Sequence, residues 1–150
     1  MNVPLPSKPV AYYALYRADD ALILGHRLSQ WCGHAPMLEE DMALSNMALD
    51  LIGQARLLYA YAGEAEGTGF TEDDYAYLRD APAYRNLLMM ALPNGDFAQT
   101  MLRQFFYTAF AERYWTAMHS SADATLAAVA GKAVKEMAYH ARHAASYCHG

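Results

Sequence analysis

The stretch from Met42 to Ala62 constrains the fold of this chain more than any other. Its only ionisable side chains other than tyrosines are Asp50 and Arg56. A helix that is apolar almost all round must be buried on most sides. We therefore expect this stretch to form the central helix of a bundle.

Three further long helices are predicted around it. Apolar side chains recur every three or four residues from Ala11 to Trp31, from Phe97 to Met118 and again beyond Asp123, which can cap the last helix. The central helix itself is expected to begin near Pro36, where acidic residues crowd the first turn, and to run to about Gly63.

The segment between the second and third long helices has its own signals. Thr71 and Asp74 have the spacing of a capping box and predict a short helix to Leu78, a smaller helical piece follows Pro82, and PNGD at 93–96 predicts a turn. No alternating strand pattern is present. The sequence thus predicts an all-α bundle of four long helices with a short helical excursion.

Composition sets the context for this bundle. Residues 1–10, with three prolines, are expected to be an extended arm before a single domain at 11–150. The net charge of −5 leaves no basic face for nucleic acid, and no stretch is apolar enough to predict a membrane span. Cys32 and Cys148 are expected to be buried thiols in a cytoplasmic protein. The 12 tyrosines and 9 methionines suggest an aromatic and apolar interface.

A four-helix bundle is a common setting for di-iron sites, which take Glu-x-x-His pairs from two of the helices. No Glu or Asp of this sequence is followed by His three residues later. Two polar stripes are present instead, and they contain Asn46, Asp50 and Gln54 on one helix and Glu136, His140 and His143 on another.

Two interpretations of these stripes stay open. Asp50, Glu136, His140 and His143 could bind a divalent metal. Alternatively, amides and an arginine could satisfy the buried acids by hydrogen bonding, and the candidates for that are Gln54, Gln99 and Arg103. Two further hypotheses are weaker. Asp19, His26 and His34 could assemble into a catalytic group near the end of the first helix, and Cys32 could be a catalytic residue.

Four long blocks of the sequence carry a family resemblance. They read LGHRLSQWCGHAPMLEEDMALSNMALDLIGQARLLYAYAGEAEG, TEDDYAYLRD, PNGDFAQTMLRQF and KEMAYHARH. The blocks, which extend from about Tyr12 to His143, closely resemble the PaaC-type subunit of bacterial phenylacetyl-CoA epoxidase. Blocks of this length in unchanged order are far more specific than a short motif.

The resemblance implies a ferritin-like fold and a non-catalytic structural subunit in a heteromer. The homologous catalytic subunit would carry the di-iron centre, and the complex would epoxidise phenylacetyl-CoA with dioxygen and with electrons from NADPH through a separate reductase. No catalytic residue and no cofactor are then expected on this chain. The candidates for a degenerate metal site are Asp50, Gln54, Glu136, His140 and His143.

Members of this family continue beyond KEMAYHARH, whereas this sequence ends at Gly150. We therefore expect a C-terminally truncated chain whose uncovered apolar faces promote self-association. Two alternative functions remain at this point: an atypical metal-binding enzyme of the same fold, and a helical protein that binds a small ligand.

Overall fold

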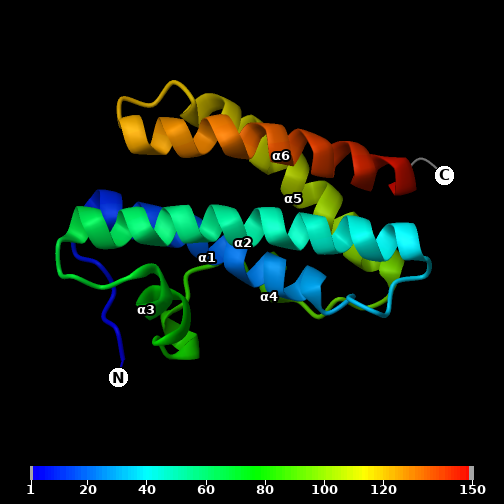
Figure 1. The fold of residues 1–150 in the computed structure, drawn as a ribbon, viewed down its shortest axis with the longest axis horizontal. Coiled ribbons are helices and arrows are strands. Elements are labelled where there is room, and N and C mark those ends of the chain that lie inside the picture. Colours follow the sequence, from blue (N-terminus) through cyan, green and yellow to red (C-terminus); the bar gives the residue numbers. More distant parts are fainter. Residues whose placement is uncertain (1, 149–150) are drawn as a thin grey trace.

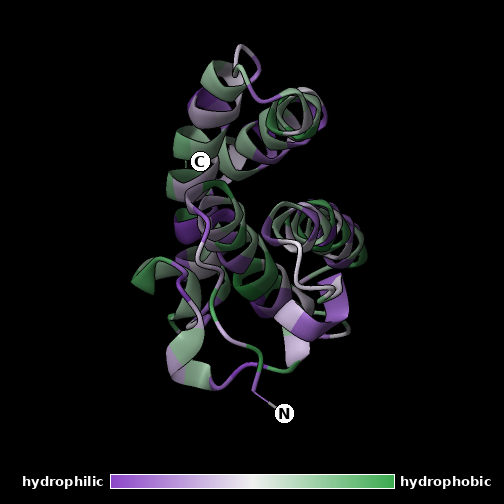
Figure 2. Ribbon diagram, turned by 90° about the vertical axis from the view of Figure 1, so that its left-hand side faces the viewer, coloured by the Kyte–Doolittle hydropathy of each residue, from purple (hydrophilic) through white to green (hydrophobic). Residues whose placement is uncertain are grey.

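The computed structural model describes residues 2–148 and arranges their long helices in two antiparallel pairs (Figure 1). α1 (Pro9–Ser29) pairs with α2 (Leu38–Glu66), and α5 (Phe97–Met118) pairs with α6 (Ala124–Cys148). The pairs meet where α2 contacts α6, and Figure 2 shows one pair above the other, seen along the helices. The described residues form no strand, so the predicted all-α, ferritin-like bundle is confirmed.

The excursion between α2 and α5 is also confirmed. It consists of α3 (Glu72–Tyr77), the 3-10 turn η1 (Ala81–Ala83) and the single turn α4 (Leu88–Ala91). The predicted capping box is present at the start of α3, where the Thr71 backbone N–H donates to the Asp74 carboxylate over 2.7 Å. The excursion packs on α1 and α2 and runs along one side of that helix pair, from Asp19 in the middle of α1 to Arg27 near its end.

The extended arm is shorter than predicted, because α1 already begins at Pro9. Proline suits the first helical turn since its missing N–H would have no partner there. The rest of the arm lies on the protein surface: the Val3 N–H donates to the Leu78 carbonyl over 2.9 Å, and Val3 is buried. Met1, His149 and Gly150, which bound the predicted arm and domain, lie outside the described residues.

The expectation that α2 is buried on most sides is wrong for its outer face. Its inner face is buried, as Met47 and Leu58 illustrate. The apolar side chains of its outer face are exposed, and these are Leu38, Met42, Leu49 and Leu57. The reason is geometric: α1, α3 and α6 together contact only part of the circumference of α2.

Both cysteines are exposed rather than buried. Cys32 lies in the turn that follows α1, and Cys148 ends α6. Free cysteine is usually buried as a small hydrophobic residue, so the expectation from residue type is wrong at both positions. Within residues 2–148, no helix has the length and apolarity needed to cross a membrane.

A buried ion pair that the sequence did not indicate fastens the excursion to α1. The Asp19 carboxylate is fully buried and accepts hydrogen bonds from the Arg79 guanidinium, the Tyr59 hydroxyl and the Arg85 backbone N–H. Its neighbour Asp20 accepts from the Leu87 N–H over 2.7 Å. Adjacent acids in the middle of α1 thus hold the segment that leads into α4.

The Asp19 cluster yields a stability prediction. Asp19→Ala leaves the Arg79 guanidinium buried without its carboxylate, and breaking such a pair costs about 3 to 5 kcal/mol. Urea denaturation followed by circular dichroism should show this loss of unfolding free energy. Asp73→Ala, which removes an exposed acid of α3, is the matched control and should change it by less than about 0.5 kcal/mol. An equal effect of both variants would contradict the role given to Asp19.

Candidate functional site

Asp50 and His140, two of the predicted candidates, meet between the helix pairs. The His140 Nε2 lies 2.9 Å from Asp50 Oδ2, which joins α6 to α2. The other ring nitrogen, Nδ1, lies 3.2 Å from Gln104 Nε2 on α5. The imidazole is fully buried and so is Gln104, whereas Asp50 is partly exposed. One histidine therefore connects three of the four long helices.

The partners of His140 fix its tautomer. A side-chain amide nitrogen can only donate, so Nδ1 must accept the hydrogen bond from Gln104. The ring proton then lies on Nε2 and is donated to the Asp50 carboxylate. Both ring nitrogens of His140 are consequently engaged by protein groups.

Glu136 and Gln54 complete the cluster, and we refer to Asp50, Gln54, Gln104, Glu136 and His140 together as the polar core. Burial, and next the charge of neighbouring Asp50, raise the pKa of Glu136 to about 7. The hydrogen bond from His140 lowers the pKa of Asp50. The two carboxyl groups thus differ in function: Asp50 carries the negative charge, and Glu136 keeps its proton up to about neutral pH.

His143 does not join the polar core. Its Nε2 lies 2.9 Å from Glu40 Oε2, near the start of α2. His140 and His143 therefore each contact a different acid of α2, and the hypothesis of one four-residue site with Asp50 and Glu136 is not supported by these contacts.

The other polar candidates lie elsewhere. Asn46 and Gln99 are exposed, and the buried Arg103 donates to the Leu92 carbonyl over 2.8 Å instead of to an acid. The interpretation that Gln99 and Arg103 satisfy buried acids is therefore wrong. His26 and His34 are exposed, so they do not group with the buried Asp19.

The sequence search missed Gln104 and Glu40. Gln104 had a detectable signal, because Thr100, Gln104 and Thr108 recur at steps of four and all three are buried. Polar residues repeated along a predicted inner face mark an internal contact. Glu40 was hidden in the acidic first turn of α2, where an acid is expected for the helix dipole alone.

The polar core does not fit a metal centre of the bundle type. His140 offers no free lone pair, since one ring nitrogen accepts from Gln104 and the other carries the proton. Among the buried atoms without a hydrogen-bond partner in residues 2–148 are the amide oxygens of Gln54 and Gln104, which are poor ligands for iron, and one Glu136 oxygen. Over the same residues no three His, Cys, Asp or Glu side chains are grouped to hold an ion.

The raised pKa of Glu136 predicts a pH dependence. The pKa rises from an ordinary 4.5 in the unfolded chain to about 7 in the fold, so the folded state binds this proton more tightly. The resulting stabilisation is complete below pH 4.5 and is lost as the pH rises through 7. Glu136→Gln keeps the group neutral and should be more stable than the native chain at pH 8 by about 1 to 2 kcal/mol, with solvent screening included.

Denaturant unfolding at pH 5 and at pH 8 measures this difference. The advantage of Glu136→Gln should be small at pH 5 and clear at pH 8. Glu64→Gln, which changes an exposed acid of α2, serves as the control and should show no such pH-dependent gain. If Glu136→Gln increased the free energy of unfolding equally at both pH values, the raised pKa of Glu136 would be contradicted.

Comparison with known proteins assigns the chain to a family. The model of the family described as "Phenylacetic acid catabolic protein" matches residues 4–149. The chain belongs to this family. The blocks from which the resemblance was inferred thus led to the right relatives, which take part in phenylacetic acid catabolism.

A curated relative shows the same kinship. The chain is 48% identical over 130 residues to a subunit of the 1,2-phenylacetyl-CoA epoxidase of Escherichia coli (strain K12). This match covers 87% of the chain and 52% of the relative. The chain therefore spans about half the length of the relative, and the resemblance to PaaC-type subunits is confirmed over that part.

Proposed function

We propose that this chain is a non-catalytic structural subunit of a multicomponent oxygenase that epoxidises phenylacetyl-CoA in aerobic phenylacetate degradation. In this proposal it binds a homologous catalytic subunit that carries the di-iron centre, and it acts in the cytoplasm. The similarity to the E. coli epoxidase subunit supports the assignment to the complex. The structural role has a separate, physical support.

That support is the closed hydrogen bonding of His140. In a metal-binding bundle an inward histidine must offer one free nitrogen to the ion. Here Gln104 and Asp50 occupy both nitrogens. The side chains that reach the middle of the bundle are therefore better suited to hydrogen bonding with one another than to binding a di-iron centre.

A subunit of this kind contributes rigidity. The polar core connects α2, α5 and α6 through directional hydrogen bonds, and the Asp19 cluster fixes the excursion to α1. A rigid face can hold the ligand helices of a catalytic partner in position, and displacement of catalytic groups by about 1 Å can cost on the order of a hundredfold in rate. In this proposal the chain supports catalysis without touching the reacting atoms.

Co-expression with the homologous catalytic subunit of the same host tests the proposal. Size-exclusion chromatography of the pair, with iron analysis of every peak, should show co-elution and iron in the heteromeric peak. The chain expressed alone should contain no stoichiometric iron. The catalytic subunit alone serves as the control for its own iron content.

Other results would contradict the structural role. Iron or manganese near one or two equivalents on the isolated chain, lost in Asp50→Ala, would support the metal-binding alternative. Failure of the native chain to co-elute with the catalytic subunit would contradict assembly. Thermal stabilisation of the isolated chain by an acyl-CoA would instead favour the small-ligand alternative.

A further inference from the structure

Buried polar atoms without a hydrogen-bond partner are concentrated in the polar core. Of the seven such side-chain atoms within residues 2–148, four lie there. They are both amide atoms of Gln54, the amide oxygen of Gln104 and one carboxyl oxygen of Glu136. Buried polar groups of folded proteins nearly always have a partner, either in the protein or in ordered water. The polar core therefore needs a further source of hydrogen bonds.

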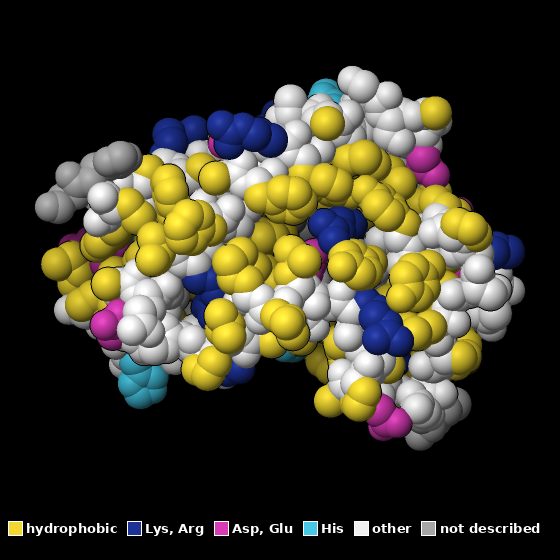
Figure 3. Space-filling model, turned by 180° about the vertical axis from the view of Figure 1, so that it is seen from behind, with side chains coloured by type: hydrophobic (Ala, Val, Ile, Leu, Met, Phe, Trp, Pro, Cys, Tyr) yellow, Lys and Arg dark blue, Asp and Glu magenta, His cyan; other side chains and the backbone are white. Residues whose placement is uncertain are grey.

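Polar groups at the surface have no such need. The basic side chains visible in Figure 3 lie among apolar ones but are open to solvent, which can form the hydrogen bonds that the protein does not. Gln54 and Gln104 have no such access, since they are 1% and 0% exposed. An unpaired amide at either position costs the full free energy of its desolvation.

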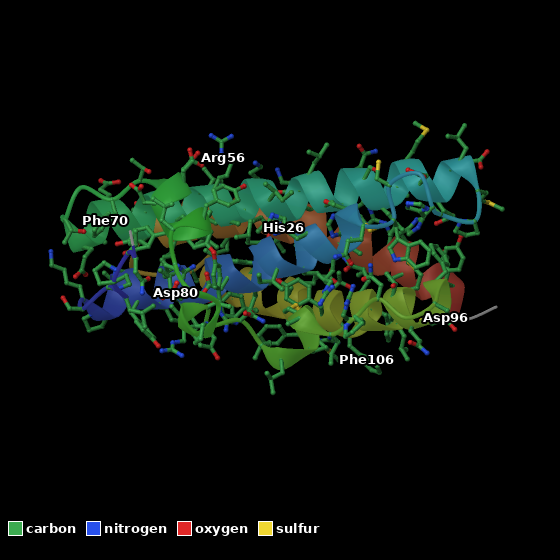
Figure 4. The ribbon with its side chains drawn as sticks, turned by 90° about the horizontal axis from the view of Figure 1, so that it is seen from below. His26, Arg56, Phe70, Asp80, Asp96 and Phe106 are labelled. Carbon is green, nitrogen blue, oxygen red and sulfur yellow. The ribbon has the colours of Figure 1, made fainter. Side chains whose placement is uncertain are left out.

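The side chains that carry the four atoms border the same part of the interior. The amide of Gln54 lies close enough to the Glu136 carboxyl group to oppose part of the rise in its pKa. Glu136 precedes His140 by one turn of α6, and His140 contacts Gln104 over 3.2 Å. Arg56, two residues after Gln54, projects outward from α2 (Figure 4), which places Gln54 on the inner side of that helix.

The polar core has too few hydrogen-bond donors for its oxygens. His140 donates its N–H to Asp50, and the Gln104 amide nitrogen donates to the imidazole. Glu136 shares its proton with the Asp50 carboxylate in a hydrogen bond that lowers the pKa of Asp50. Within residues 2–148 no protein donor reaches the amide oxygen of either glutamine. Backbone N–H groups inside a helix are already used by the helix itself.

Water fits this set of atoms better than an ion does. One water molecule can donate two hydrogen bonds, as the two glutamine oxygens require, and can accept another from the Gln54 N–H. A cation would coordinate the oxygens but would leave the Gln54 N–H without an acceptor. An anion would be repelled by the charge of Asp50. The unpaired atoms thus favour a small neutral molecule that both donates and accepts.

We propose that the polar core binds ordered water molecules, which join Gln54 of α2 to Gln104 of α5 and Glu136 of α6. Buried waters typically make about three hydrogen bonds each to groups that would otherwise have none. These molecules form a second connection between the helices that His140 already joins. The site belongs to the interior of this chain, so the inference does not depend on the proposed function.

Magnetisation transfer from water to the two glutamine side chains tests this proposal. In the 15N-labelled native chain, the NH2 protons of Gln54 and Gln104 should show NOE and ROE cross-peaks to water that have opposite signs. Opposite signs identify water that stays bound while the protein tumbles, whereas simple proton exchange gives the same sign in both experiments. The exposed Gln99 side chain is the internal control and should show no such pair of cross-peaks.

Matched variants locate the water. Gln54→Met replaces the amide by an apolar group of similar length and should abolish the water cross-peaks of Gln104, whereas Gln99→Met should leave them unchanged. The Thr108 hydroxyl, which donates to the Gln104 carbonyl over 2.8 Å, could imitate water because its proton exchanges with solvent. Thr108→Val should therefore leave the cross-peaks in place. Circular dichroism melting checks that each variant is folded.

Several results would overturn the inference. One is the absence of water cross-peaks at both glutamines in the folded native chain, and another is their loss in Thr108→Val. A higher melting temperature in potassium or ammonium chloride than in choline chloride of equal ionic strength, abolished by Gln54→Met, would identify a cation as the occupant. A crystal structure in which both glutamine oxygens accept directly from protein donors would also contradict it. Failure to bind the catalytic subunit would overturn the proposed function and leave this inference standing.

Discussion

The hydrogen bonds of His140 are the interaction on which the middle of the bundle depends. A buried imidazole between Gln104 and Asp50 holds α5, α6 and α2 in fixed register, because hydrogen bonds are directional where apolar contacts are not. The helix pairs also meet where α2 packs on α6 and where side chains of α1 contact α5, as Tyr13 contacts Tyr114. The polar core therefore contributes directional contacts to the way in which one pair sits on the other.

A second polar contact has the same function at the edge of the fold. Asp19 fastens the excursion to α1, and this in turn positions α4 beside the first turns of α5. The structure thus uses its buried charges to arrange helices and leaves apolar side chains such as Phe106 on the outside. This distribution suits a subunit that functions through its surface, and it explains how a small helical chain can be rigid and still expose large apolar residues.

Sequence reasoning succeeded where the signal is local. The bounds of α5, the capping box at Thr71 and the Asp123 cap, whose carboxylate accepts from the Leu126 N–H over 2.9 Å, follow from periodicity and turn chemistry. Sequence reasoning failed where burial or pairing of a side chain depends on which distant part of the chain packs against it. Packing across the fold decides whether the outer face of α2 is buried. It also brings Asp19 to Arg79, which lies sixty residues further along the chain. For the site, Asp50 and His140 were found from their helical spacing, whereas Gln104 and the separate pairing of His143 with Glu40 required the structure.

The central claim is that His140 is held by protein groups and is not available to a metal. Two-dimensional 15N–1H correlation of the imidazole nitrogens, with His140 assigned through a His140→Gln variant, measures this directly. The account predicts the tautomer with the proton on Nε2 and nitrogen shifts that do not change when ferrous iron is added in excess. A proton on Nδ1, or a metal-dependent shift of either His140 nitrogen, would contradict it.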